Sequence, residues 1–257
     1  MADSEKRRSL IQQYLVQNGA CSISALASRL EVSTMTIRRD MELLAGKGLV
    51  RVYHGVVVPL KEEATSLQEY ALTKAEAVHV QEKLRIARAA ASMVEPEDIL
   101  FIDGGSTAAL VARELPRGIP LTIICLSLNA FLNVAGNPAA EVILAGGIYH
   151  EETHIFEGPE SIELIRRYRA TKAFVSANGF REDLGVTCSN NYLLSIKQAV
   201  LRSSIQKILV ADSSKFGKVN SCYFADLSDF SELITDDGLP DSALQSIRDS
   251  GTKVQAV

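Results

Sequence analysis

The strongest constraint on the fold is an alternation of short apolar strands with helices, which begins near residue 82 and continues toward the C-terminus. The predicted strands are rich in β-branched residues and apolar on both sides, and they cover residues 99–102, 121–125, 141–145, 173–177, 208–211 and 232–235. A strand without a polar face must be covered on both sides. The pattern therefore predicts an α/β domain built on a mostly parallel sheet with helices on both faces.

The first 58 residues follow a different pattern, with short helices and no long strand. Helical periodicity covers residues 5–18, and Ser24 opens a second short helix. Ser33 is a strong N-cap for a third helix, because its hydroxyl can accept a backbone N–H that has no helical partner. Two β-branched runs, 49–53 and 56–58, flank a His-Gly turn and predict a hairpin. Three helices followed by a hairpin predict a winged helix-turn-helix.

The third helix carries the candidate DNA-reading surface. Its residues Ile37, Met41 and Leu44 lie within about 60° of one another on a helical wheel, so we expect them to face the core. Arg38 and Arg39 fall outside this stripe, and arginine can bind guanine edges or phosphates in a major groove. The arginines alone favour a solvated helix face, but the preceding helix, the serine cap and the hairpin reverse this and favour a groove-binding helix. The candidate DNA-binding residues are Ser33, Thr34, Met35, Thr36, Arg38, Arg39, Arg51 and His54.

Charge is divided unevenly along the chain. Residues 1–58 hold eight basic and five acidic side chains, whereas the remainder holds 19 basic and 26 acidic ones, within a net charge of −4. A basic module on an acidic body is typical of a protein in which one small part binds a polyanion. Residues 59–80 are mixed and polar, with a weak helical pattern. We therefore expect a DNA-binding domain at 1–58, a linker at 59–80 and an α/β domain at 81–257.

The sequence also restricts location and cofactors. No stretch reaches the roughly 18–20 apolar residues of a membrane-spanning helix, and the N-terminus lacks the apolar segment of a signal peptide. The four cysteines form no Cys-x-x-Cys pair, which favours free thiols in a reducing compartment. His150 and His154 lie in a segment without helical periodicity, and a zinc site needs three or four converging ligands. We expect a cytoplasmic protein without a membrane partner, metal or cofactor.

Small and polar residues follow the predicted strands, and parallel sheets bind ligands beyond the carboxyl ends of their strands. The run DGGST at 103–107 joins a strand to a helix, so its N–H groups can bind a phosphate; a glycine turn with a helix cap fits equally well. It lacks the lysine of a Walker A loop, so nucleotide hydrolysis is not indicated. Asp212 and Lys215, at another strand end, can hold a sugar hydroxyl and a phosphate, or form a structural ion pair. The candidate ligand-binding residues are Asp103, Gly105, Ser106, Thr107, Ser127, Asn129, Gly147, Lys197, Asp212 and Lys215.

Together these stretches resemble the DeoR family of bacterial transcriptional repressors. The head carries VSTMTIRRD at 32–40, the family's recognition-helix signature, followed by LVR at 49–51. Its wing reads His-Gly-Val-Val, where the family usually has His-Gly-Gly-Ala. In the body, DGGST stands where the family commonly reads Asp-Ser-Gly-Thr-Thr, and DSSKFG at 212–217 is the most specific match. The match extends over nearly the whole chain in the family's motif order.

The resemblance implies a sensor domain similar to ribose-phosphate isomerases and CoA-transferases, with a phosphorylated sugar as effector. It implies a repressor of a sugar or nucleoside catabolic operon that binds a double-stranded DNA operator and is released by that effector, with Lys215 as the counter-charge. Residues 125–132 and 187–188 are more similar to the branch of the family that controls deoxyribonucleoside catabolism, which implies deoxyribose 5-phosphate. Because helix-turn-helix proteins usually pair their heads on half-sites, we also expect a homo-oligomer.

A sugar-phosphate isomerase with an accessory DNA-binding head is the alternative function. An isomerase needs a general base within reach of the reacting carbon. The crevice offers Asp103 and Asp212, but clustered acids with a nearby glutamate are not evident in the sequence. The repressor is therefore favoured, and no enzymatic activity is expected.

Overall fold

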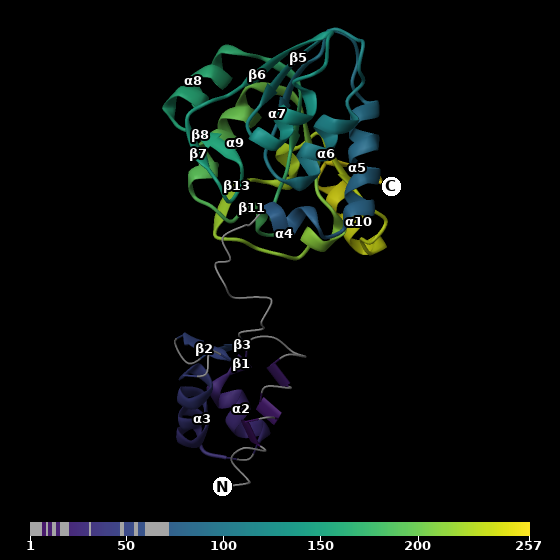
Figure 1. The fold of residues 1–257 in the computed structure, drawn as a ribbon. Coiled ribbons are helices and arrows are strands. Elements are labelled where there is room, and N and C mark those ends of the chain that lie inside the picture. The colour runs from purple at the N-terminus through teal and green to yellow at the C-terminus, as the bar shows by residue number, and fades with distance from the viewer. Residues whose placement is uncertain are drawn as a thin grey trace. The chain divides into compact units, whose positions relative to one another are not determined.

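The computed structural model describes residues 7–8, 10–11, 14–15, 21–30, 32–46, 49–53, 56–59 and 72–257. The chain divides into two compact units, Met1–Leu67 and Gln68–Val257, which are described separately (Figure 1). The predicted class is confirmed, because a small helix-turn-helix unit precedes a larger unit with a parallel sheet covered by helices.

The smaller unit is a winged helix-turn-helix. Its described elements are β1 (Cys21–Ser22), α2 (Ile23–Arg29), α3 (Thr34–Gly46), β2 (Val50–Tyr53) and β3 (Val56–Pro59), and the described residues before β1 are helical at 7–8, 10–11 and 14–15. The expected hairpin is confirmed, since β2 and β3 pair antiparallel. Strand β1, which pairs with β3, was not predicted, because two residues are too few to show a strand period.

The serine caps of this unit differ partly from the prediction. The Ser33 hydroxyl accepts the backbone N–H of Thr36 at 3.1 Å, which confirms it as the cap of α3. The start of α2 at Ser24 is wrong: Ser22 is the cap, and its hydroxyl accepts the backbone N–H of Ala25 at 3.1 Å. Both serines lie close together in sequence, and the one with extended backbone geometry takes the cap.

Helix α3 packs through its predicted stripe, since Ile37, Met41 and Leu44 are all buried in the core of the smaller unit. Asp40 lies on the same side and is 2% exposed. Its two carboxylate oxygens accept the Arg7 Nε–H at 2.6 Å and an Arg8 guanidinium N–H at 3.3 Å. This buried carboxylate therefore joins residues 7 and 8 to α3.

The larger unit is built on a seven-stranded sheet whose neighbouring strands are all parallel. In spatial order its strands are β15 (Lys253–Ala256), β14 (Glu232–Thr235), β12 (Ser204–Val210), β9 (Ala170–Val175), β4 (Ile99–Ile102), β5 (Leu121–Cys125) and β6 (Ala140–Leu144). All six predicted strands are present. Strand β15 was missed, because its exposed alternation of Lys253 and Gln255 does not resemble a buried strand.

Helices cover both faces of this sheet, as predicted. One face packs against α5 (Val80–Ser92), α6 (Ser106–Glu114) and α7 (Leu128–Val134), and the other against α8 (Pro159–Arg167), α9 (Tyr192–Arg202) and α10 (Asp241–Asp249). Within β4, Leu100 and Ile102 enter the first core while Phe101 enters the second, as the two-residue period of a strand requires.

Two smaller sheets were not predicted. A hairpin is formed by β7 (Ile148–His150) and β8 (Ile155–Glu157), and a second antiparallel sheet by β10 (Gly179–Arg181), β11 (Gly185–Cys188) and β13 (Cys222–Ala225). Two short 3-10 helices, η1 (Ser213–Lys215) and η2 (Leu227–Asp229), complete the described elements. No described helix is long and apolar enough to cross a membrane.

The C-terminal part of the expected linker belongs to the larger unit. Helix α4 (Leu72–Glu76) begins at a residue that is 1% exposed, and the backbone N–H of Leu72 donates to the carbonyl of Glu152 at 2.9 Å. The division between the units falls between Leu67 and Gln68, within residues 60–71, which lie outside the described part. The linker therefore ends earlier than residue 80, because an isolated buried leucine in a polar stretch gives no periodic signal.

We expect Asp40→Asn to weaken the smaller unit. The amide keeps the size of the side chain but loses the charge that holds both arginines, and losing such a charged hydrogen bond costs about 1–3 kcal/mol. Hydrogen exchange of the α3 amides measures this as a lower free energy of local opening. Glu42→Gln, on the exposed face of the same helix, is the control and should leave the exchange unchanged. Equal exchange in both variants would contradict a structural role for Asp40.

Candidate functional site

The site lies where the connection order of the sheet reverses. Strands β4, β5 and β6 extend the sheet in one direction, whereas β9, β12, β14 and β15 extend it in the other. The reversal falls between β4 and β9, and such a point is where open parallel sheets form a ligand crevice beyond the strand ends. Asp103 follows β4 there, and Ser176 follows β9.

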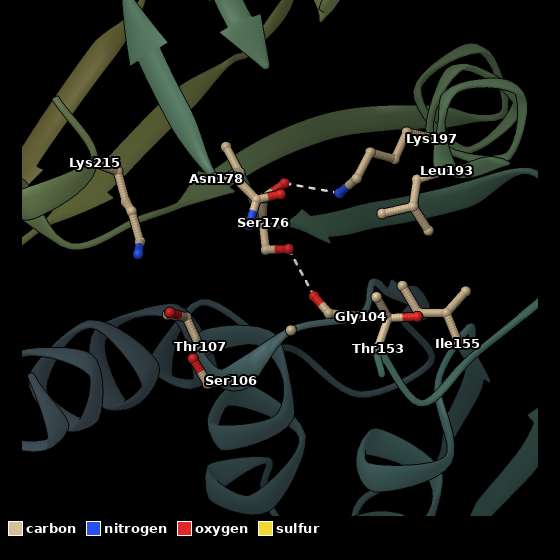
Figure 2. Close-up of a pocket in the computed structure, with 12 residues that line it drawn as sticks. Gly104, Ser106, Thr107, Thr153, Ile155, Ser176, Asn178, Leu193, Lys197 and Lys215 are labelled. Atoms are coloured by element: carbon tan, nitrogen blue, oxygen red, sulfur yellow. Dashed lines mark hydrogen bonds between the residues drawn. The ribbon is translucent and has the colours of Figure 1, made fainter. Parts of the chain in front are cut away.

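A buried ion pair fixes the two strand ends. The Lys197 ammonium of α9 donates to Oδ2 of Asp103, and their side chains are 3% and 1% exposed. The same carboxylate oxygen accepts the backbone N–H of Ser176 at 2.9 Å and its hydroxyl at 3.1 Å. Lys197 donates further to the carbonyl of Ser176 at 2.8 Å (Figure 2). The other oxygen of Asp103, Oδ1, is buried and has no hydrogen-bond partner among the described residues.

A pocket opens above this pair. Its lining residues come from the β4–α6 turn, the β7–β8 loop, the ends of β9 and η1, and α9; they are Gly104, Gly105, Ser106, Thr107, Thr153, Ile155, Ser176, Ala177, Asn178, Leu193, Lys197 and Lys215. Figure 2 shows the Lys215 side chain reaching toward Thr107, while Lys197 points toward Ser176. Lys197, on one side of the pocket, is therefore engaged in the buried ion pair with Asp103, and Lys215 lies on the other side.

Lys215 has no ion pair with a carboxylate in the described part of the chain. Burial lowers the pKa of Lys215, the nearby Asp212 opposes this shift and Lys218 adds to it. A half-buried ammonium without a counter-ion is a site where an anion would gain free energy. Lys215 is therefore suited to bind a negatively charged group.

The turn that carries Lys215 is held by two carboxylates. Asp212 caps η1, and its Oδ1 accepts the backbone N–H of Ser214 at 3.2 Å. Asp236, at the end of β14, accepts the backbone N–H of Ser213 at 2.6 Å and the Ser213 hydroxyl at 2.7 Å. Burial acts to raise the pKa of Asp236, but these hydrogen bonds hold it below its ordinary value. Asp236 thus positions η1, and the sequence reasoning missed it.

The opposite wall is the N-terminus of α6. Gly105 precedes this helix with φ +96, a conformation that favours glycine. The first N–H groups of a helix have no intrahelical acceptor, and the helix dipole adds partial positive charge there. This wall therefore faces Lys215 with further donors for an anion, as the DGGST run predicts.

The glycine before it lets the Ile155 side chain of the β7–β8 hairpin pack directly on the turn. A Cβ at Gly104 would lie 2.2 Å from Cδ1 of Ile155, so a larger residue would force this side chain to move. The hairpin is held against α9, because His150 stacks on Tyr192 with ring centroids 3.7 Å apart and Thr153 Oγ1 lies 3.0 Å from the Tyr192 hydroxyl. The β7–β8 hairpin, which we call the roof of the pocket, is therefore attached to α9, the helix that carries Lys197.

The structure brings together half of the predicted ligand residues. The five that line the pocket are Gly105, Ser106, Thr107, Lys197 and Lys215. Asp103 does not line it but accepts a hydrogen bond from Lys197. The other residues that do not line it are Ser127, Asn129, Gly147 and Asp212. Asn129 contacts Glu76 at 3.4 Å, and a Cβ at Gly147 would meet the Glu157 carbonyl at 2.4 Å, so both have packing roles.

Several lining residues were not predicted. Thr153, Ile155 and Leu193 come from the hairpin and α9, and no local pattern marks them as neighbours of the β4 end. Ser176 and Asn178 could have been found, because they follow a buried strand in the same way as Asp103. The described residues contain no group of three or more potential metal ligands, and His150 is engaged with Tyr192.

On the smaller unit, most candidate DNA-binding residues share the outer side of α3. Thr34, Met35, Arg38 and Arg39 are exposed, and Met35 is 60% exposed. Ser33 uses its hydroxyl as the helix cap and lies 2.9 Å from the Thr36 hydroxyl. The side chain of Arg51 and the whole of His54 lie outside the described residues.

Such a pairing of a helix-turn-helix unit with a ligand-pocket unit defines a DNA-binding regulator. The comparisons agree: a model of the DeoR-like helix-turn-helix domain matches residues 7–62, and a model of the DeoR C terminal sensor domain matches residues 78–237. The deoxyribose operon repressor of Escherichia coli (strain K12) is 33% identical over 232 residues, 90% of each chain. The L-fucose operon activator of Haemophilus influenzae is 31% identical over 239 residues, covering 92% of this chain and 93% of its own. The chain therefore belongs to the DeoR family of transcriptional regulators.

Solved structures give weaker similarities. Ribose 5-phosphate isomerase A from Methanocaldococcus jannaschii has a TM-score of 0.39 with 19% identity, over 52% of this chain and 53% of its own. The full-length sorbitol operon regulator SorC from Klebsiella pneumoniae has a TM-score of 0.36 with 14% identity, over 84% and 91%. Scores at this level carry no functional conclusion.

We expect Lys197→Met to destabilise the larger unit by about 3–5 kcal/mol, because it leaves the Asp103 carboxylate buried without its counter-charge. Adding Asp103→Asn should restore part of this loss, since the remaining amide carries no charge. Urea unfolding measures both. Lys253→Met on exposed β15 is the control. A single Lys197→Met variant as stable as this control would show that the pair does not hold the site.

Proposed function

We propose that this protein is a repressor of a sugar or nucleoside catabolic operon that a phosphorylated sugar releases from its DNA operator. One observation carries the effector part. The pocket places the Lys215 ammonium, which has no ion pair among the described residues, beside the N-terminus of α6, and next to the lining residue Lys197 lies Oδ1 of Asp103, a buried carboxylate oxygen without a hydrogen-bond partner in the same part of the chain. The names of two relatives, a deoxyribose operon repressor and an L-fucose operon activator, support sugar metabolism as the regulated process.

The two ends of the pocket favour different groups of one ligand. A phosphate fits between Lys215 and the N–H groups at Gly105, Ser106 and Thr107, because both sides supply positive charge and hydrogen-bond donors. A hydroxyl fits near Asp103, because an unpartnered carboxylate oxygen can only accept a hydrogen bond. A compound with a phosphate at one end and hydroxyls at the other satisfies both, and deoxyribose 5-phosphate is the candidate from the family resemblance.

The pocket fits binding better than catalysis. No carboxylate among the described residues lines the pocket, and Asp103, which lies next to the lining residue Lys197, is held by Lys197 and Ser176, so it is poorly placed to move as a general base. Purified protein should therefore not isomerise ribose 5-phosphate, and measurable turnover would contradict this proposal.

DNA binding is assigned to the outer side of α3 and to the wing that follows it. We propose that the protein acts as a homo-oligomer, because one small unit offers few base contacts and paired helix-turn-helix units read two half-sites. We propose that the larger unit forms the oligomer and binds the effector. The linker before it ends ahead of α4.

We expect Arg38→Ala and Arg39→Ala each to weaken operator binding while the smaller unit stays folded. A base-reading arginine should cost about 1–3 kcal/mol and relax specificity at one position, whereas a phosphate-binding arginine should weaken all sequences alike. Selection of binding sites from random DNA, followed by affinity measurements, distinguishes the two. Unchanged operator affinity in the double variant would rule out α3 as the recognition helix.

We expect Lys215→Ala to weaken binding of deoxyribose 5-phosphate about 10- to 100-fold, because a charge-assisted phosphate contact is lost. Operator affinity without effector should not change. Isothermal titration of wild type and variant with a panel of sugar phosphates measures the effect, and Lys218→Ala, an exposed lysine three residues later, is the control. If both variants bind like wild type, Lys215 is a structural lysine.

The same lysine gives the binding a pH dependence. Phosphate prefers the ammonium form, and burial lowers the pKa of free Lys215 from its ordinary value of 10.5. Affinity should therefore be full below that lowered pKa and fall as pH rises through it, with the decline beginning below the pH expected of an exposed lysine. Lys215→Arg stays charged and should remove the decline. Identical alkaline profiles for wild type and Lys215→Arg would contradict the assignment.

A further inference from the structure

Helix α4 is the first described element that follows the DNA-binding unit along the chain, and its start is attached to the roof of the pocket. Leu72 is 1% exposed, and its backbone N–H donates to the carbonyl of Glu152 at 2.9 Å. Glu152 belongs to the β7–β8 loop, in which the next residue, Thr153, lines the pocket. One hydrogen bond therefore joins α4 to the loop that covers the ligand.

The other end of α4 is held by a buried lysine. Lys83 of α5 is 2% exposed, and its ammonium donates to the carbonyl of Ala75 at 2.6 Å and to that of Val78 at 2.7 Å. Within the described residues it forms no ion pair with a carboxylate. A cation at the C-terminal end of a helix is favourable, but a buried ammonium held only by carbonyls remains under-compensated.

A third contact joins α4 to α7. The Glu76 carboxylate, at the last residue of α4, lies 3.4 Å from Nδ2 of Asn129 in the first turn of α7. Three elements, namely the β7–β8 loop, α5 and α7, thus hold a helix of only five residues, and the first of them lines the pocket. A helix this short has little stability of its own, so these contacts decide whether it stays in place.

We propose that α4 is the regulatory link between effector and DNA, and that Lys83 is its positioning residue: a ligand that orders the β7–β8 loop stabilises the hydrogen bond of this loop to Leu72, while Lys83 holds the other end of α4 through the carbonyls of Ala75 and Val78. This inference rests on the proposed function of the pocket. The effector favours the state with α4 firmly held, and DNA favours the state with α4 released. By linkage, each ligand then weakens the other by the same factor.

The test uses the full-length protein and three probes: deoxyribose 5-phosphate, ribose 5-phosphate and inorganic phosphate. Hydrogen exchange of residues 72–83 is measured with and without each probe, and operator affinity is measured under the same conditions. In wild type, a probe that binds should slow exchange in this segment and lower operator affinity about 5- to 150-fold. Fast, unchanged exchange while the probe still releases the operator would overturn the proposal, and this result needs no variant.

Lys83→Met provides the second arm. It should bind the probe within about fivefold of wild type, since Lys83 does not line the pocket. Its effector-dependent protection of residues 72–83 and its operator release should both be lost, while operator affinity without probe is kept. Lys83→Arg should retain part of the response, because the charge and the donors remain. Lys74→Met, an exposed lysine on α4 itself, is the control and should respond like wild type.

The two failures are distinguishable. If wild type binds no probe, or if Lys215→Ala binds as tightly as wild type, the proposed pocket is wrong and the inference falls with it. If wild type binds a probe and Lys83→Met is released from DNA as readily as wild type, the pocket stands and only the role of Lys83 and α4 is overturned.

Discussion

The structure of the larger unit depends on how the β4–β9 strand pair is fixed at both ends. Before β4, Asp98 pairs with Lys172 of β9 at 2.6 Å; after β4, Asp103 pairs with Lys197 of α9 and with the backbone after β9. All four side chains are at most 10% exposed. A slip of one residue would separate both pairs and leave several buried charges unpaired, which is far costlier than losing apolar contacts. The reversal point of the sheet, and with it the pocket, is therefore held in one register.

Much of this could be predicted from the sequence, because the decisive signals are local. Doubly apolar strands such as β4 and β5 and the serine cap of α3 each show within a few residues. The glycine turn at 103–107 and Lys215 were also identified as parts of one site, since parallel strands end at the same edge of the sheet. The family motifs, which carry the same residues, strengthened this prediction.

The parts that could not be predicted are those made by long-range contacts. The Ile155 side chain of the β7–β8 hairpin packs on the glycine turn because Gly104 has no side chain, and these two residues are about fifty positions apart in sequence. Asp236 positions Lys215 through Ser213, across two neighbouring strands, and neither residue carries a pattern that links it to the other. Asp40 fits the charged surface of a recognition helix by composition, but its arginine partners bury it. Spacing in sequence does not encode such pairings.

The lysines of the larger unit separate into two groups, and the difference bears on function. Lys172 and Lys197 are buried with carboxylates, so their charges are compensated within the protein and serve the fold. Lys83 and Lys215 are buried or half-buried without an ion pair among the described residues, and burial lowers the pKa of both. An apolar side chain at either position would cost less for the fold alone. Charges that the fold does not compensate are expected where another group compensates them: for Lys83 these are the carbonyls of Ala75 and Val78, and for Lys215 the proposed anion.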